Sequence, residues 1–213
     1  MQTKKGQSIE DASMKMIEDE IGSHNYNEKE WPIVRRIIHS TADFDFADKN
    51  RLIFQKDAIE SGMSALKNGC SIVVDVNGVI GGLNKQNPKD FGNNIVCNIS
   101  KSEVMQQAKD EGKTRSQVSM RIAKDDIDGG IVAIGNAPTA LMEVIEMVNE
   151  GIVKPALIIG IPVGFICAPE SKEALSKLEG TPFITNLGRK GGSSSASAII
   201  NAIFKLIRAE SST

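Results

Sequence analysis

Five short apolar runs recur along the chain, and longer segments of mixed polar and apolar residues separate them. The runs are rich in β-branched residues and continuously apolar, which is typical of strands buried on both faces of a sheet. They occupy residues 71–75, 94–97, 131–135, 156–160 and 182–185. Amphipathic stretches between and after them lie at 139–150, 171–178 and 193–208. This alternation predicts an α/β fold with a mostly parallel five-stranded sheet and helices on both faces.

The first third of the chain has a different pattern, with extra N-terminal helices before the strands begin. Pro32 stands near the start of one of these helices, where proline is tolerated. Asn68-Gly69 is a typical helix end. In chain order we expect two charged helices, a short strand, a further helix and a loop, at residues 9–21, 28–41, 51–54, 57–67 and 84–93.

The composition narrows the possible functions. The chain has 213 residues, with 25 Lys and Arg against 27 Asp and Glu. This balance lacks the basic footprint of a general nucleic-acid binder, and an aromatic content of 4% disfavours a platform for stacking bases. No apolar run approaches the ~18 residues of a membrane helix, and the N-terminus lacks a signal-peptide core. We expect a cytoplasmic, single-domain protein over residues 1–213, with ends that fray at 1–7 and 210–213 and no nucleic-acid or membrane partner.

Three cysteines and two histidines limit the metal and redox chemistry to be expected. Cys70, Cys97 and Cys167 lie far apart and near apolar runs, which favours buried free thiols in a reducing compartment over a disulfide framework. With two histidines and no closely spaced cysteine pair, a classical zinc site is not expected. We therefore expect neither a metal site nor a cofactor.

Small and polar residues follow every predicted strand. Ligands of open α/β sheets bind beyond the carboxyl ends of the strands. Asp75 and Asn77 follow the first core strand, and Asn136 and Thr139 follow the third. Such loops also need Gly, Pro and capping residues for turn geometry alone, so a single loop means little and Asp75 could be an acid, a base or a cap. Five loops together indicate an extended floor for a large ligand.

The last predicted strand leads into Gly188-Arg189-Lys190-Gly191-Gly192-Ser193, which opens a helix of small residues. Backbone amides at a glycine-rich helix start can bind an anion, and Arg189 and Lys190 add positive charge. The segment lacks the spacing of a Walker loop, and no Gly-x-Gly-x-x-Gly follows a strand. The prediction is therefore an anion site that suits carboxylates as well as phosphates.

Two charged side chains are further candidates. His39 falls in the last turn of a predicted helix, where the negative end of the helix dipole favours the protonated form, so it could be a general acid. A surface or capping histidine is the commoner role. Arg115 follows Gly112 at a plausible helix start and could clamp a carboxylate in bidentate fashion, although solvated arginines are more frequent there.

Taken together, these segments resemble the precorrin-8X methylmutase family of cobalamin biosynthesis over residues 17–202. Each motif is short, but their order and spacing are specific. The family often has Val-Asn-Met-Val where this chain has Val76-Asn77-Gly78-Val79, and Cys or Gly where it has Ser40-Thr41. Neither departure removes a charged group. The motifs are Arg36-Ile37-Ile38-His39, Asp75-Val76-Asn77-Gly78-Val79, Lys113-Thr114-Arg115-Ser116, Ala133-Ile134-Gly135-Asn136-Ala137-Pro138-Thr139-Ala140-Leu141, Gly160-Ile161-Pro162-Val163-Gly164-Phe165, Glu170-Ser171-Lys172 and Gly188-Arg189-Lys190-Gly191-Gly192-Ser193.

The resemblance implies a flavodoxin-like, three-layer α/β/α fold, a homodimer, and an isomerase that moves a methyl group from C-11 to C-12 of a corrin-type macrocycle. The substrate is then precorrin-8X in one branch of the pathway and its cobalt complex in the other, giving hydrogenobyrinate or cobyrinate. The resemblance also implies that His39 is the acid and that Arg115 lines the substrate pocket. The substrate-binding residues that we predict are Asp75, Asn77, Arg115, Asn136, Thr139, Arg189, Gly192 and Ser193.

Two other functions remain compatible with the residues. A flavin- or nucleotide-dependent oxidoreductase could use the same fold, although the missing phosphate fingerprints disfavour it. A non-catalytic tetrapyrrole carrier would bind the same ligand without converting it. The sequence does not distinguish a metal-free from a cobalt-loaded substrate.

Overall fold

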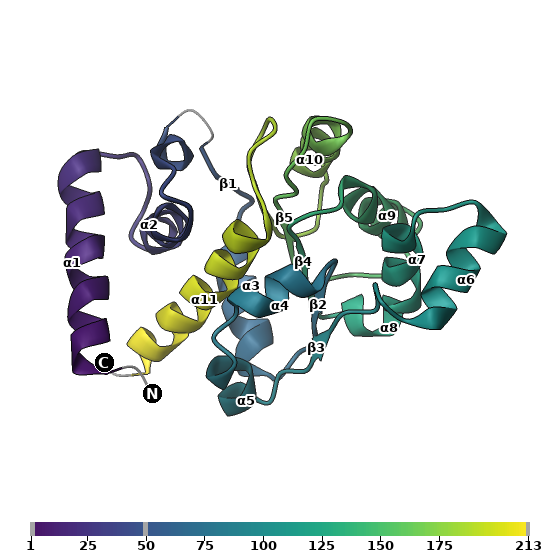
Figure 1. Ribbon diagram of the computed structural model, residues 1–213, viewed down its shortest axis with the longest axis horizontal. Helices are drawn as coiled ribbons and strands as arrows, with labels where there is room; N and C mark the ends of the chain where they lie inside the picture. Colours follow the sequence, from purple (N-terminus) through teal and green to yellow (C-terminus); the bar gives the residue numbers. More distant parts are fainter. Residues whose placement is uncertain (1–2, 49–50, 212–213) are drawn as a thin grey trace.

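The computed structural model describes residues 3–48 and 51–211 and contains one sheet of six strands (Figure 1). Their order across the sheet is β1-β6-β5-β4-β2-β3. Five strands are parallel, and β1 runs antiparallel to β6. The strands are β1 (Ile53–Phe54), β2 (Ile72–Val74), β3 (Ile95–Val96), β4 (Ile131–Ile134), β5 (Leu157–Gly160) and β6 (Phe183–Thr185). The expected number of five strands is therefore wrong, because Ile53 and Phe54 pair with Thr185 and Ile184 and extend the sheet.

Helices cover both faces of the sheet, and alternate residues of each strand face opposite sides (Figure 1). Ile72 and Val74 of β2 pack into one core, whereas Val73 packs into the other. The helices on the first face are α1 (Lys4–Ile21), α2 (Glu30–Thr41), α3 (Ala58–Lys67), α4 (Asn77–Gly82), α5 (Gln86–Phe91) and α11 (Ser193–Glu210). Those on the second face are α7 (Arg115–Ile122), α8 (Lys124–Ile127), α9 (Pro138–Asn149) and α10 (Ala168–Ser176), and α6 (Ser102–Glu111) packs on α7.

Helix α11 packs on β4 and β5, and α2 packs on α11 (Figure 1). The apolar stripe of α2 is completely buried at Ile33 and Ile37. Each such side chain contributes roughly 1.5–3 kcal/mol on burial. This packing carries the end of α2, with His39, to the start of α11.

Helices also form in segments that the sequence pattern did not assign to helices, among them α4, α5, α6 and α8. Residues 84–93, expected to be a loop, contain α5, in which Pro88 occupies the first turn, where its missing N–H is harmless. Asn77–Gly82 forms α4 despite its glycines, because it packs against α11 through Val79. Residue patterns of six positions are too short to reveal helical periodicity.

The terminal helices reach into the segments 1–7 and 210–213 that were expected to fray. Helix α1 already begins at Lys4, where Thr3 caps it by accepting the N–H of Gly6. Helix α11 continues to Glu210, which forms an ion pair with Lys67. The remaining residues of the expected frayed ends, 1–2 and 212–213, lie outside the described residues.

The cysteines are less buried than expected. Cys70 and Cys97 are half-buried, and burial raises the pKa of the Cys70 thiol to about 11. Cys167 is exposed just before α10, so the expectation of three buried thiols is wrong at this position.

Over residues 3–48 and 51–211, no helix combines the length and apolarity needed to cross a membrane.

Candidate active site at the start of helix α11

From β2 the sheet is extended in both directions, by β3 on one side and by β4, β5 and β6 on the other, so the strand order reverses between β2 and β4. In open α/β sheets, ligands bind at such a switch point, outside the carboxyl ends of the strands. Val74 is opposite Ala133 in the register of β2 and β4, so Asp75 and Gly135 follow the two strands at the same edge. The candidate residues that follow β2 and β4 therefore lie near this edge.

The carboxylate of Asp75 binds three backbone amides of the loop after β4. It accepts the N–H groups of Gly135, Asn136 and Ala137 at 3.0, 2.8 and 2.6 Å. Its side chain is fully buried, and burial raises the pKa of the carboxyl group while the three hydrogen bonds oppose that rise. Asp75 therefore holds the loop that presents the exposed Asn136 and does not itself face solvent.

The start of α11 packs closely against the residue after β4 and against the first turn of α4, because both positions are glycines and have no side chain. A Cβ atom added to Gly135 would lie 2.7 Å from Cα of Ser193, and one added to Gly78 would lie 3.0 Å from its Oγ. The N–H of Gly192 donates to the carbonyl of Ile161, just beyond β5, at 3.0 Å. Gly192 and Ser193 thus lie at the switch point, with Asn77 next to Gly78 at the start of α4.

The first turn of α11 offers unpaired hydrogen-bond donors. Its N-cap, Gly192, has no side chain, and within the described residues the N–H groups of Ser193, Ser194 and Ser195 have no acceptor. The hydroxyl of Ser195 is also buried without a partner among those residues. Free amides at the positive end of an 18-residue helix favour an anion.

The two cations of the preceding loop differ in availability. Lys190 forms ion pairs with Asp43 and Asp45 at 2.8 and 2.7 Å, so its charge is neutralised and does not add to the anion site as the sequence indicated. Arg189 is exposed, and its guanidinium carbon lies 5.3 Å from the centre of the Phe165 ring. Of the two, Arg189 is the side chain that can meet a ligand.

His39 lines a cavity of about 220 Å³ beside the start of α11. The hydroxyl of the next residue, Ser40, donates to the carbonyl of Ser194 at 3.5 Å. Burial lowers the pKa of His39, and the nearby charges of Arg36 and Lys205 lower it further, while Glu10 acts in the opposite direction. This direction is opposite to the one expected from the position of His39 at a helix end, because desolvation and two cations act against the protonated form.

Glu10 of α1 sets the charge around His39. It accepts from Arg36 at 2.8 Å and from Lys205 at 3.0 Å, and so joins α1, α2 and α11. An anionic ligand placed beside these two cations would compensate their charge and favour the protonated form of His39. Ligand binding would in that case favour protonation of His39.

Arg115 and Thr139 lie together on the other side of the switch point. Thr114 caps α7 in a capping box with Gln117, and its Oγ1 donates to Oγ1 of Thr139 at 3.1 Å. This bond places Arg115, the first residue of α7, beside the first turn of α9. Arg115 is exposed and has no hydrogen-bond or ion-pair partner within residues 3–48 and 51–211.

Lys172 of α10 contacts the loop that leads to α11, and the sequence analysis gave it no role. Its side chain is completely buried, although it carries a charge. The buried residues Ala168, Ser171, Lys172 and Leu175 follow the spacing of a helix face. This periodicity is the signal that could have revealed a lysine on the inner face of the helix.

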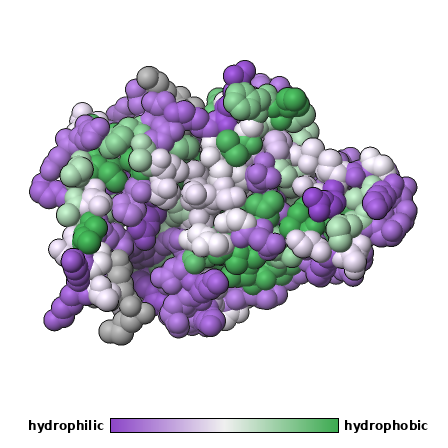
Figure 2. All heavy atoms as spheres, viewed as in Figure 1, coloured by the Kyte–Doolittle hydropathy of each residue, from purple (hydrophilic) through white to green (hydrophobic). Residues whose placement is uncertain are grey.

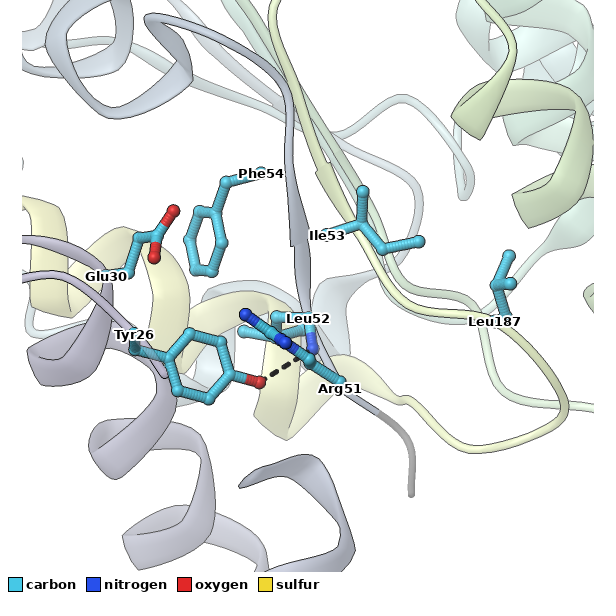
Figure 3. Close-up of a pocket in the computed structure, with 7 residues that line it drawn as sticks. All are labelled: Tyr26, Glu30, Arg51, Leu52, Ile53, Phe54 and Leu187. Carbon is cyan, nitrogen blue, oxygen red and sulfur yellow. Dashed lines mark hydrogen bonds between the residues drawn. The ribbon is translucent and has the colours of Figure 1, made fainter. Parts of the chain in front are cut away.

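A second cavity, of about 450 Å³, lies at the antiparallel edge of the sheet beside β1 (Figure 3). The hydroxyl of Tyr26 donates to the carbonyl of Phe46 at 3.0 Å and accepts the N–H of Leu52 at 3.2 Å, and Arg51 stacks over the ring at 5.0 Å. None of the predicted site residues lines it. Its walls are Tyr26, Glu30, Arg51, Leu52, Ile53, Phe54 and Leu187. In the described part of the chain, no group of three or more His, Cys, Asp or Glu side chains is placed to hold a metal ion.

Comparisons with known proteins agree over nearly the whole chain. The family model described as precorrin-8X methylmutase matches residues 8–206. A cobalt-precorrin-8 methylmutase of Priestia megaterium is 49% identical over 197 residues, which are 92% of this chain and 86% of that protein. A precorrin-8X methylmutase of Sinorhizobium sp. is 34% identical and covers 93% of both chains. The crystal structure of a precorrin-8X methylmutase from Thermus thermophilus has a TM-score of 0.89 at 38% identity, with 96% and 98% of the two chains covered.

Proposed function

The chain belongs to the precorrin-8X methylmutase family, isomerases of cobalamin biosynthesis, and from this premise we propose that it moves a methyl group from C-11 to C-12 of precorrin-8X or cobalt-precorrin-8. The observation that carries the proposal is one histidine that lines the same cavity as Ser194, a residue of a helix start rich in free amides. The reaction breaks the bond between C-11 and the methyl carbon and forms the bond to C-12. The composition of the macrocycle does not change, so no oxidant, reductant or second substrate is required.

We propose that His39 is the general acid. A proton on the macrocycle polarises the conjugated system and favours migration, and the proton is returned when the product forms. In the free protein the pKa of His39 is lowered by burial and by Arg36 and Lys205. Binding of a polycarboxylate beside these cations raises that pKa, so His39 becomes an acid when the substrate is present.

We propose that the carboxylates of the macrocycle bind around the switch point. Backbone amides at Ser193 and Ser194, the free Arg115 and the exposed Arg189 are suitable donors. Asp75, fully buried on three amides, has the indirect role of holding the loop in place. The residues that we propose to contact substrate are Asn77, Arg115, Asn136, Thr139, Arg189, Gly192 and Ser193.

We propose further that the protein is a homodimer in which a second copy covers part of the substrate. The cavity at His39 is about 220 Å³, below the roughly 300–1,000 Å³ of typical ligand pockets. Beyond β5, Phe165 and Ile166 are 81% and 83% exposed, and hydrophobic side chains gather on the surface near α10 in Figure 2. Sedimentation of the wild type as a dimer, and of Phe165→Asp as a monomer, would support this; a monomeric wild type would contradict it.

The finer description of the fold is part of the same proposal. The five parallel strands follow the order 2-1-3-4-5 when numbered along the chain, which is the order of flavodoxin-like sheets. Together with helices on both faces, this order supports a flavodoxin-like, three-layer architecture. A cytoplasmic location is supported by three cysteines that form no disulfide.

The decisive experiment mixes the pure protein with metal-free and with cobalt-loaded substrate and follows the visible spectrum. We expect conversion of at least one of them, loss of conversion in His39→Ala, and unchanged conversion in His24→Ala, because His24 stacks on Trp31 away from the cavity of His39. Turnover of His39→Ala within a few-fold of wild type would contradict the acid role. Binding without any spectral conversion would favour the carrier alternative, and a yellow chromophore that copurifies would favour the oxidoreductase.

A further inference from the structure

A lysine without a counter-ion lies beneath the glycine-rich loop that precedes α11. Lys172 is completely buried, and its ammonium contacts the carbonyl of Lys190 at 2.7 Å and Oδ1 of Asn186 at 3.3 Å. No carboxylate within the described residues pairs with it. Burial lowers its pKa to about 8. A charged group kept in so unfavourable a place, next to a ligand site, suggests a functional role beyond packing.

The contact to Lys190 controls the direction of one peptide group. In a planar trans peptide, the C=O of one residue and the N–H of the next point in opposite directions. Lys172 and Nδ2 of Asn186, which donates at 3.0 Å, both bind the carbonyl of Lys190. The N–H of Gly191 must therefore point away from Lys172, and within the described residues it has no acceptor.

The next residues make the position of this peptide exact. The N–H of Gly192 donates to the carbonyl of Ile161, so the loop is tied to the end of β5 one residue later. A Cβ atom on Gly191 would lie 2.2 Å from that same carbonyl oxygen, so no side chain fits there. The loop is thus held by two hydrogen bonds, one from Lys172 to the carbonyl of Lys190 and one from the N–H of Gly192 to the carbonyl of Ile161. The free N–H of Gly191 directly precedes the free N–H groups of the first turn of α11.

We propose that Lys172 is a positioning residue that fixes the Lys190–Gly191 peptide so that the Gly191 N–H joins the amides of Ser193 and Ser194 in binding one carboxylate of the substrate. The buried, unpartnered hydroxyl of Ser195 in the same turn is a second unsatisfied group at this site. The proposal rests on the proposed function, because it requires a polycarboxylate ligand. In this proposal the side chain of Lys172, which lies outside the cavity, sets the affinity for that ligand.

The test compares Lys172→Met with the matched control Lys177→Met. Lys177 lies just beyond the same helix and is exposed, with its ammonium on Glu173. The probe is hydrogenobyrinate, the metal-free product, titrated by visible absorption, alongside steady-state kinetics. We expect Lys172→Met to raise both the Kd and the KM about tenfold with kcat within about threefold of wild type, which corresponds to one lost charge-assisted hydrogen bond. Lys177→Met should match wild type in all three.

A second readout separates positioning from general stability. In ¹H–¹⁵N spectra of the wild type, the amide signal of Gly191 should shift on addition of hydrogenobyrinate, and this shift should be lost or much reduced in Lys172→Met. If Lys172→Met does not fold, Asn186→Leu replaces it, since it removes the other donor to the carbonyl of Lys190 and should also weaken binding.

The possible failures can be told apart. Absence of binding and conversion in the wild type would overturn the proposed function. Normal wild-type binding, with a Kd in a folded Lys172→Met that equals wild type, or with a Gly191 signal that ignores the ligand, would overturn the role of Lys172 and leave the proposed function standing. Loss of kcat without any change in Kd would also contradict it, because a binding contact would not act in that way.

Discussion

The carboxylate of Asp75, just after β2, accepts the N–H of Ala137 at 2.6 Å and so ties the end of one strand to the start of α9. Together with the bonds to Gly135 and Asn136, it satisfies three successive amides at the switch point of the sheet. An acidic side chain that looks like a catalytic group in the sequence thus shapes the loop on which the ligand-facing residues stand.

Replacement of Asp75 by Asn tests this role. One carboxylate oxygen becomes an NH₂ group that faces backbone N–H donors, so at least one buried amide loses its acceptor. We expect the free energy of unfolding to fall by roughly 2–3 kcal/mol in urea denaturation. Asp125→Asn, at an exposed position on α8, should change it by less than about 0.5 kcal/mol. Equal stability of the two variants would contradict the stabilising role of the hydrogen bonds between Asp75 and the loop after β4.

Gly135→Ala tests the close contact between β4 and α11. Its new Cβ atom would lie 2.7 Å from Cα and 2.9 Å from N of Ser193, both backbone atoms that cannot rotate away. We expect a loss of roughly 1–3 kcal/mol in stability and a weaker affinity for the corrinoid, because the amides of α11 are displaced. Gly81→Ala is the control, since nothing lies within 4 Å of its added Cβ and alanine favours a helix. A stable Gly135→Ala variant with normal affinity would contradict the packing described.

The titration of His39 can be followed by ¹H NMR. Because burial, Arg36 and Lys205 lower its pKa, we expect a midpoint below the ordinary 6.5 in the free protein. Glu10→Gln removes the group that opposes this shift and should lower the midpoint further, whereas Glu20→Gln, exposed on the same helix, should not. Hydrogenobyrinate should raise it. A midpoint at or above 6.5 without ligand would overturn this account of the site.

Lys172 should make stability depend on pH. Its pKa is about 8 in the folded protein against 10.5 ordinarily, so between these values the unfolded chain binds more protons and stability rises with pH. We expect the wild type to gain on the order of 3 kcal/mol relative to Lys172→Met from pH 8 to 10.5. The nearby Lys190 is held by Asp43 and Asp45, and Glu173 pairs with Lys177, so Lys177→Met should keep the wild-type slope. Parallel curves for wild type and Lys172→Met would contradict the burial of a charged amine.

Much of the architecture could be predicted from the order of apolar and polar residues. Continuous β-branched runs predicted the five parallel strands, because a strand buried on both faces cannot tolerate alternating polar residues. The glycine-rich segment before Ser193 was likewise recognisable as a helix start with free amides. A short strand at residues 51–54 was also expected, but its pairing with β6, which makes it the sixth strand, was not. The helices α4 and α5 were not expected either, because elements of two to six residues depend on pairing or packing with distant segments.

The chemical state of the site groups was decided only when the chain folded. His39 is at a helix end in either description, but its pKa direction depends on Arg36 of its own helix and on Lys205 and Glu10 of two others. In the sequence Lys190 is a candidate to bind a ligand, but in the folded protein it forms ion pairs with Asp43 and Asp45. Local sequence determines which face of an element is apolar, whereas desolvation and charge–charge interactions depend on which elements come together. The sequence therefore identified the candidate side chains of the site. Tertiary packing determined which of them are buried, which form ion pairs and which can contact a ligand.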